Sequence, residues 1–521
     1  MSGFPAAPGG RTVGRRVIQA NPNRQMLAPK LGKAPLSANP RVIERSNLIL
    51  KNRQKLCTPR SDMLQTMGIQ KLITSTYVQN EEGNMVELPD LKDTQPNQYN
   101  EIMRKKLKEC CKPCDFGSPT ADSQNKATKS KYLTEVLEHI KTSRYFQLCD
   151  TQTFDVLFEM ITKNIFRTLP PIPPLSRVPM IGDDIKDTLL EATWPHLDII
   201  YHIFLEFLGS PQMVVAQHIK RFDNAFLSNF FALFDSTDPR ERESMKMVLH
   251  RLYMKFNQLR PKMRQIMQQI FFSFLYDRTS FSGINELLEF YISIINGFTV
   301  PIKPDNLKFL FNILIPLHGS DYFHLFQENL FYCILQYIEK DPSLIPKIIH
   351  EIIKYWPNSS FKGLLFLAEI SALIDSMSED QFKIVMVEVF HLVARCIESP
   401  NFQISETAIL LWKSDNFVLY VAQYAGTIFP LIIPALYRAG KNHWNNGIKN
   451  IAISVLRICM QIAPELYDQV YRGLDEIEAI LNKKTEQEKG AWIELKGLAN
   501  DVDPELEFTN FPNTVENVFK R

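Results

Sequence analysis

The sequence predicts an all-α protein built as an α-solenoid. From Tyr99 to Ala463, apolar residues recur with the 3.6-residue period of amphipathic helices, and few stretches alternate as strands do. Prolines recur roughly every 20 to 45 residues at positions that fit the first turn of a helix. This spacing indicates helix pairs stacked in series. A closed bundle of long helices is the structural alternative that the pattern leaves open.

The repeat length further specifies the solenoid. Asp238-Pro239 begins one predicted helix and Lys262–Tyr276 forms the next, and Asp341-Pro342 and Phe361–Ser376 repeat that order. Helix pairs of roughly 40 residues are typical of HEAT and armadillo repeats, although the register here is irregular. We therefore expect irregular HEAT-like repeats over residues 96–480. A charged C-terminal helix and a loose tail are expected over residues 481–521.

Residues 1–95 are predicted to form a disordered basic tail. They are rich in Pro, Gly, Asn, Gln and basic residues and show no sustained apolar period. The first 60 residues contain twelve Lys or Arg and a single acid, Glu44, whereas the whole chain has a net charge of +2. The tail fits nucleic acid, import receptors or acidic protein surfaces by charge alone. It lacks the interleaved aromatic residues that stack on bases, so nucleic acid is not favoured and a solvated tail is the simpler interpretation.

The stretch from Asp238 to Arg260 is predicted to be a helix with two different faces. Asp238 fits the capping position, Pro239 the first turn, and Glu241 and Glu243 the positive end of the helix dipole. The core side is an apolar stripe of Met245, Val248, Leu249, Leu252, Phe256 and Leu259. Beside it runs a polar and aromatic stripe of Lys246, His250, Tyr253, Asn257 and Arg260. The second stripe fits an extended acidic peptide, but it is equally typical of a satisfied histidine and a snorkelling arginine beside a core.

The sequence contains no recognisable catalytic motif. It has no GxxxxGK[ST], no GxGxxG after a strand and no HExxH, so an enzyme is not favoured and no cofactor is expected. The pair Cys111-Lys-Pro-Cys114 has metal-site spacing, but no second pair completes four ligands, so reduced thiols are expected instead of a metal. We expect neither a secretory signal nor a membrane span, and the protein is placed in the cytoplasm or the nucleus.

Several blocks of sequence resemble the B-prime regulatory subunits of protein phosphatase 2A. The resemblance extends from about Asn97 to Asn500, and its blocks follow one order along the chain. They include Leu107-Lys-Glu-Cys-Cys111, Phe166-Arg-Thr-Leu-Pro-Pro171, Thr193-Trp-Pro-His-Leu197, Asp238-Pro-Arg-Glu-Arg242, Leu249-His-Arg-Leu-Tyr253, Ser293-Ile-Ile-Asn-Gly-Phe298, Lys354-Tyr-Trp-Pro357, Ser399-Pro-Asn-Phe-Gln403 and His443-Trp-Asn445.

The resemblance implies a stack of HEAT-like repeats that performs no chemistry itself. It implies partners in the phosphatase scaffold subunit, the catalytic subunit, and proteins with a short LxxIxE motif. The implied motif-binding residues are His250, Arg251, Tyr253, Arg260, Phe290, Ile294 and Lys303. The acidic start of the predicted helix is similar to a family loop facing the catalytic subunit, which gives Asp238, Glu241 and Glu243 as expected contacts.

Two positions depart from the family pattern. Phe290 stands where isoleucine is common, and Asn306 stands where histidine is usual. The first change reshapes an apolar pocket, and the second removes a donor to the motif's glutamate. Three functions follow for comparison: a targeting subunit of the phosphatase, another α-solenoid adaptor such as a nuclear-transport or trafficking scaffold, and an enzyme in an all-α fold. Formation of a trimer with the scaffold and catalytic subunits separates the first two.

Overall fold

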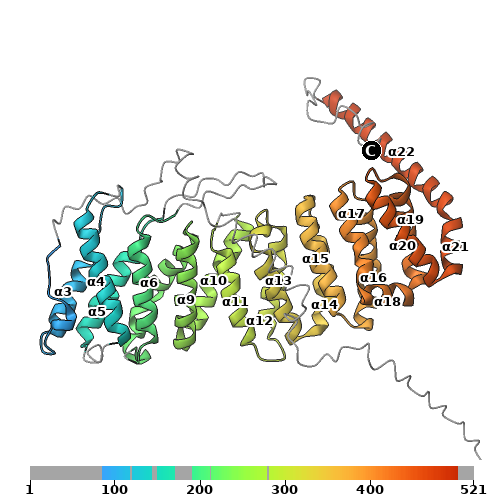
Figure 1. Ribbon diagram of the computed structural model, residues 1–521. Coiled ribbons are helices and arrows are strands. Elements are labelled where there is room, and N and C mark those ends of the chain that lie inside the picture. Colours follow the sequence, from blue (N-terminus) through green and yellow to red (C-terminus); the bar gives the residue numbers. More distant parts are fainter. Residues whose placement is uncertain are drawn as a thin grey trace, which may run out of the picture. The chain divides into compact units, whose positions relative to one another are not determined.

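The computed structural model describes residues 85–117, 120–142, 149–169, 190–211, 213–277 and 281–502. These residues all belong to the second of two units, residues 61–521. Within the described ranges the regular structure is helical, without strands, and successive helices stand side by side (Figure 1). The predicted all-α solenoid is confirmed. The predicted tail, residues 1–95, lies outside the described residues up to position 84, and so does the C-terminal tail beyond residue 502.

The helices form two layers, and each helix packs on the preceding and following members of its own layer. Neighbours in the first layer meet through backbone proximity or through ring contacts such as Phe158 on Phe226. The first layer contains α3 (Tyr99–Glu109), α5 (Thr151–Ile165), α8 (Asn224–Ala232), α10 (Arg260–Tyr276), α12 (Pro304–Phe309) with the π-helix η8 (Leu310–Leu314), α14 (Ile345–Lys354), α16 (Glu379–Ile397), α19 (Ala425–Asn442) and α21 (Pro464–Arg472).

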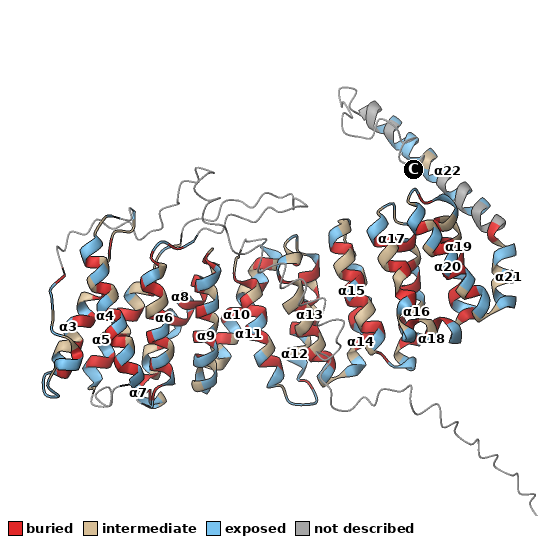
Figure 2. Cartoon of the chain, in the orientation of Figure 1, coloured by how far each residue is buried: buried red, intermediate tan, exposed pale blue. Residues whose placement is uncertain are grey.

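The second layer is continuous through direct helix contacts from one end to the other. It contains α4 (Ser123–Thr142), α6 (Trp194–Gly209), α9 (Pro239–Lys255), α11 (Ile284–Asn296), α13 (Phe323–Lys340), α15 (Ser360–Ser376), α17 (Phe402–Ile409) and α20 (Asn446–Ile462). The core lies between the layers, where the helices turn their buried faces toward one another (Figure 2). Each repeat therefore completes the core of its neighbours, as in other solenoids.

Shorter elements and one long helix complete the described chain. They are α7 (Val215–His218), α18 (Asp415–Gln423), α22 (Leu474–Val502), η3 (Leu91–Asp93), η5 (Ile219–Arg221), η6 (Leu233–Asp235), η7 (Asn257–Leu259), η9 (Pro316–Gly319), η10 (Pro342–Leu344) and η11 (Leu410–Lys413). Helix α22 runs without a break across the boundary predicted at residue 480, and residues 85–91 pack on α4 through Met85 and Leu91. The domain boundaries themselves stay predictions.

Proline and glycine set the positions of α9 and its neighbours. Pro195, Pro239, Pro261 and Pro304 lie in the first turns of α6, α9, α10 and α12, as the spacing of prolines predicts. Gly283, just before α11, lies so close to η6 that a Cβ would come within 2.5 Å of the Phe234 carbonyl oxygen. Only glycine fits this approach. The start of α11 is thereby held against the segment that leads into α9.

No single helix in the described ranges is long and apolar enough to cross a membrane. Helices α18 and α19 pass such a test only when taken together, and they meet at a bend of 111°.

Candidate functional site

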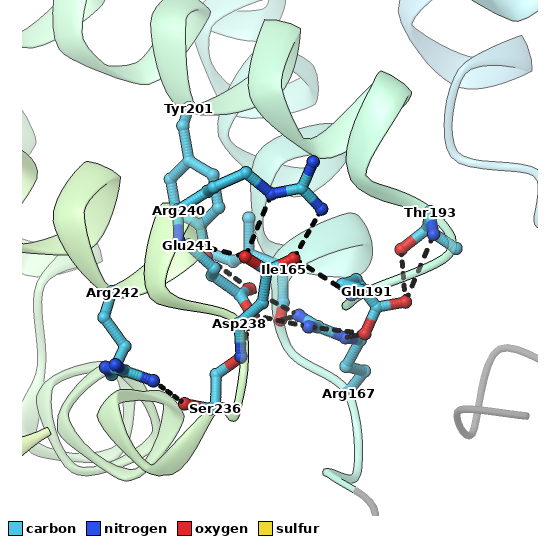
Figure 3. Close-up of polar contacts among 10 residues, drawn as sticks. All are labelled: Ile165, Arg167, Glu191, Thr193, Tyr201, Ser236, Asp238, Arg240, Glu241 and Arg242. Carbon is cyan, nitrogen blue, oxygen red and sulfur yellow. Dashed lines mark hydrogen bonds and ion pairs between the residues drawn. The ribbon is translucent and has the colours of Figure 1, made fainter. Parts of the chain in front are cut away.

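Helix α9 begins in a buried polar network instead of at the surface. Asp238 caps the helix as predicted, because its carboxylate accepts from the Arg240 backbone N–H at 2.9 Å. The same carboxylate accepts from the Glu191 N–H at 2.9 Å and from the Arg240 guanidinium at 2.7 Å. The Asp238 residue is 0% exposed. Its carboxylate thus ties the start of α9 to the segment before α6 (Figure 3).

Glu241 is the centre of this network. Its two oxygens each accept from the Arg167 guanidinium at 2.7 Å, which is the bidentate geometry of a strong ion pair. Tyr201 donates to the same carboxylate at 2.9 Å and Ser236 at 2.5 Å. Glu241 is 0% exposed, so three segments of the chain, around Arg167, around Tyr201 and over residues 236–241, meet at one buried carboxylate (Figure 3).

The ionisation of the network follows from burial and pairing. Burial favours a higher pKa for Glu191, but the Arg167 charge and the bonds from Thr193 outweigh it and lower the pKa below its ordinary value. Burial favours a lower pKa for Arg167, but the hydrogen bonds to Glu241 outweigh burial and raise the pKa of Arg167 above its ordinary value. Burial raises the pKa of Tyr201 well above its ordinary value, and the Glu241 charge adds to the rise. The network therefore holds a charged Glu191, a charged Arg167 and a neutral Tyr201 phenol.

Burial bears on the contacts that we expect of two acids. Asp238 and Glu241, expected to contact a catalytic subunit, have buried carboxylates that accept hydrogen bonds from within the chain, and their expected contact stays a prediction. Desolvated carboxylates are paired internally here because an unpaired one would be strongly unfavourable. Glu243, two residues after Glu241, is different: its side chain is 55% exposed and pairs with Lys246 at 2.8 Å. Its expected contact is a prediction too.

The sequence predicted that one helix carries the whole polar stripe, but in the structure the stripe is divided between α9 and α10. Helix α9 ends at Lys255, the backbone leaves helical angles at Phe256, and Arg260 begins α10. Arg260 nevertheless returns to α9, because its Nε donates to the Tyr253 carbonyl at 2.7 Å and its guanidinium lies 4.9 Å from the Tyr253 ring centre. The interruption bends the chain so that a cation covers the tyrosine face.

Tyr253 also joins α9 to α11. The Phe290 ring meets the Tyr253 ring edge-on, with 5.4 Å between centres. Three of the predicted motif-binding residues, Arg260, Tyr253 and Phe290, therefore form a continuous stack. Phe290 is 2% exposed, so its ring forms a buried aromatic wall at the base of this stack.

The other predicted residues lie at different distances from this stack. His250 and Arg251 are exposed on α9 and, together with Phe290, line a groove of about 800 Å³ between α4, α6, α9 and α11. Ile294 is buried one turn after Phe290. Lys303 is exposed just before α12, and within the described part of the chain no hydrogen bond or ion pair joins it to the other six. Nearby, Tyr337 donates to the Asn306 carbonyl at 2.9 Å and ties this turn to α13.

Lys246, on the same stripe, lies between two carboxylates. It pairs with Glu243 at 2.8 Å and with Glu289 of α11 at 2.7 Å. Burial favours a lower pKa for Lys246, but its hydrogen bonds to both acids outweigh burial and raise the pKa above its ordinary value. Its charge is therefore matched within the chain, unlike the exposed Arg251 nearby, for which the described residues offer no ion-pair partner.

The geometry shows a groove lined in part by His250, Arg251 and Phe290, and comparison with known proteins gives the family of the chain. The model of the protein phosphatase 2A regulatory B subunit (B56 family) matches residues 88–499. The chain belongs to the B56 family.

Relatives cover most of the chain. A serine/threonine-protein phosphatase 2A regulatory subunit of Caenorhabditis elegans, pptr-1, is 34% identical over 460 residues, covering 86% of this chain and 82% of its own. The 56 kDa regulatory subunit delta 1 isoform of Schizosaccharomyces pombe is 34% identical over 472 residues, covering 89% and 84%. The alpha isoform of Homo sapiens is 34% identical over 421 residues, covering 81% and 85%.

Membership of the B56 family confirms the resemblance seen in the sequence and makes this chain a regulatory subunit, not the catalytic one. Among the described residues, no group of three His, Cys, Asp or Glu side chains is arranged to hold a metal ion. Cys111 and Cys114 are free thiols whose pKa values are raised, chiefly by burial.

The sequence did not indicate the partners of the buried network. Arg167 and Tyr201 bond to Glu241 and lie 74 and 40 positions away from it in the sequence. Glu191 joins the network by pairing with Arg167, and no local pattern connects these residues. One signal was available: Arg167, Glu191 and Glu241 lie in or beside three of the blocks that carry the resemblance. Charged residues in separate blocks that resemble a family are candidates for one buried ion-pair cluster.

Proposed function

We propose that this B56 chain joins the scaffold and catalytic subunits of protein phosphatase 2A and recruits proteins that carry an LxxIxE-type short motif. Family membership supports the regulatory role, since the relatives are named as regulatory subunits of that phosphatase. The motif site rests on one observation above the others. Arg260, Tyr253 and Phe290 form a stack that combines a cation, an amphipathic ring and an apolar wall in contact.

Each part of the stack matches a part of the motif. The Leu and Ile side chains of the motif are apolar, and burying either one against Tyr253, Phe290 and Ile294 contributes about 1.5–3 kcal/mol before ordering costs. The motif's glutamate carries a charge that suits a guanidinium with fixed geometry, and Arg260 is held in place by the Tyr253 carbonyl. Lys303 and Arg251 are exposed cations on either side of this contact in the sequence.

Peptide titration tests the motif site. An LxxIxE peptide is titrated against the wild type and against a His250→Ala, Arg260→Ala double variant by calorimetry. We expect the double variant to bind at least tenfold more weakly, because a charge-assisted contact and a wall are both lost. A peptide with Ala in place of Leu, Ile and Glu is the control. Equal affinity of both proteins for the intact motif contradicts the site.

Assembly is tested separately. The purified chain is mixed with the scaffold and catalytic subunits and analysed by size-exclusion chromatography with light scattering. A trimer with one copy of each is the expected result. Failure to co-migrate contradicts the assembly part of the proposal and leaves the motif site to be judged by the titration.

A further inference from the structure

The groove beside the proposed motif site is longer than a contact with His250, Arg251 and Phe290 requires. It continues from α9 across the last turns of α6 to the end of α4, three helices that stand next to one another in the second layer (Figure 1). At that far part its lining includes Ile140, Lys141, Leu205, Gly209 and Met247. Its volume of about 800 Å³ lies within the roughly 300–1,000 Å³ of ordinary ligand sites.

At the far part of this lining the apolar side chains are partly open to solvent, whereas Lys141 and Lys246 are paired with acids. Met247 is 40% exposed, and Leu205 is half-buried beside it in the groove. An unbranched methionine adapts to different apolar partners. In contrast, Lys141 stands 3.8 Å from Glu206, and Lys246 is held by two carboxylates. The exposed apolar surface at this end of the groove therefore favours contact with an apolar side chain over a strongly charged one.

Gly209 keeps the far part of the groove open. It is exposed in the last turn of α6, and a Cβ built there would meet no atom within 4 Å. Gly209 lines the groove, and a larger side chain at this position has space around its Cβ. The position thus offers a way to fill the groove without displacing the core.

We infer that the α4–α6 end of this groove binds a segment of the recruited protein that flanks its LxxIxE motif and carries an apolar side chain. The inference rests on the proposed motif site, because the groove is continuous with that site through His250, Arg251 and Phe290. A peptide held at Tyr253 and Phe290 passes directly into the groove when it continues toward α6. The recognition surface then spans α4, α6, α9 and α11 instead of α9 and α11 alone.

Three peptides test this inference. The first carries the six motif residues between Gly-Ser flanks, and the other two add a Leu-containing segment on the N-terminal or the C-terminal side. We expect one of the extended peptides to bind the wild-type chain about five- to tenfold more tightly than the first, as burial of one leucine would produce after ordering costs. No gain from either extension overturns the inference.

A groove-filling variant localises the gain. Gly209→Leu should remove the advantage of the extended peptide and leave the affinity for the short peptide unchanged. Gly426→Leu is the matched control, because Gly426 is also an exposed glycine of a helix, α19, with no atom within 4 Å of a built Cβ, and it lies outside the groove. Leucine is a better helix former than glycine, so both variants should fold. A gain that survives Gly209→Leu overturns the inference.

The outcomes separate this inference from the proposed function. If the short peptide does not bind the wild type, the motif site is wrong and the inference falls with it. If the short peptide binds but neither extension helps, only the inference is wrong. A photo-reactive leucine in the flanking segment provides a direct readout. Cross-links mapped by mass spectrometry to the segment around Leu205 or Met247 support the groove, and cross-links confined to other repeats contradict it.

Discussion

The two ends of α9 lie in opposite surroundings although they belong to one helix of 17 residues. At the start, Asp238 and Glu241 are fully buried and bonded to Arg167, Tyr201 and Arg240. At the other end, His250 and Arg251 are exposed beside a groove, and Tyr253 is half-covered by Arg260.

The difference comes from what crosses each end of the helix. The segments around Arg167 and Glu191 cover the start of α9 and bring a guanidinium with them. Nearer the other end of α9, Lys246, Met247, His250 and Arg251 line the groove. Charged residues of one helix are thus buried and paired within the chain at one end and exposed beside a groove at the other. Sequence type alone does not distinguish these roles, because both ends are rich in charged and aromatic residues.

The largest expected effect on the free energy of unfolding comes from a substitution at the buried start of α9. Glu241→Ala removes both bonds to Arg167 and leaves that guanidinium with Glu191 as its remaining carboxylate. Removing one partner of a buried ion pair costs about 3–5 kcal/mol. Urea denaturation followed by circular dichroism should show this loss in the free energy of unfolding.

The control for this prediction lies two residues further along. Glu243→Ala removes an exposed partner of Lys246, which retains Glu289, and should change stability by less than about 1 kcal/mol. Equal losses in the two variants would contradict the contrast between buried and exposed acids.

The next effect concerns the exposed end. Tyr253→Ala removes the ring that supports Arg260 and contacts Phe290, and we expect about tenfold weaker binding of an LxxIxE peptide, equivalent to about 1.4 kcal/mol. Tyr253→Phe retains the ring and should bind within about twofold of the wild type. Calorimetric titration measures both. Similar losses in the two variants would point to the hydroxyl and not to the stack.

A smaller effect appears as a pH dependence of the buried end. Because the folded pKa of Glu191 lies below that of a free glutamate, its charge stabilises the fold above the ordinary value of 4.5. This contribution should disappear as the pH falls through the lower folded pKa. Denaturation midpoints measured from pH 7 downward should fall less steeply below pH 4.5 in Glu191→Gln than in the wild type. Parallel curves would show that Glu191 does not contribute.

The smallest effect on stability concerns Glu243, whose expected contact with the catalytic subunit is a proposal. Glu243→Lys should leave the free energy of unfolding within about 1 kcal/mol, since the side chain is 55% exposed. If Glu243 lies at the interface, the same change slows association with the scaffold and catalytic subunits, because charges at an interface rim act mainly on the association rate. Surface plasmon resonance with unchanged kinetics would remove Glu243 from the interface.

Much of the fold could be predicted because its signals are local. A carboxylate at Asp238, a proline at 239 and an apolar stripe with helical period are enough to start α9 where it does start. The same signals failed at its end. No proline or glycine stands between Leu252 and Arg260, and the helix nevertheless stops at Lys255.

The sequence by itself determined the helical class, the repeat-by-repeat order and the family, because capping and periodicity depend on residues within a few turns of one another. Only the tertiary structure decided which acids are buried and where the groove runs. Glu241 is internal because Arg167, 74 positions away in the sequence, bonds to it, and the groove exists because α4, α6, α9 and α11 each supply part of its lining. Burial and ion pairing depend on residues that are distant in the sequence, and the sequence of a single helix does not include those residues.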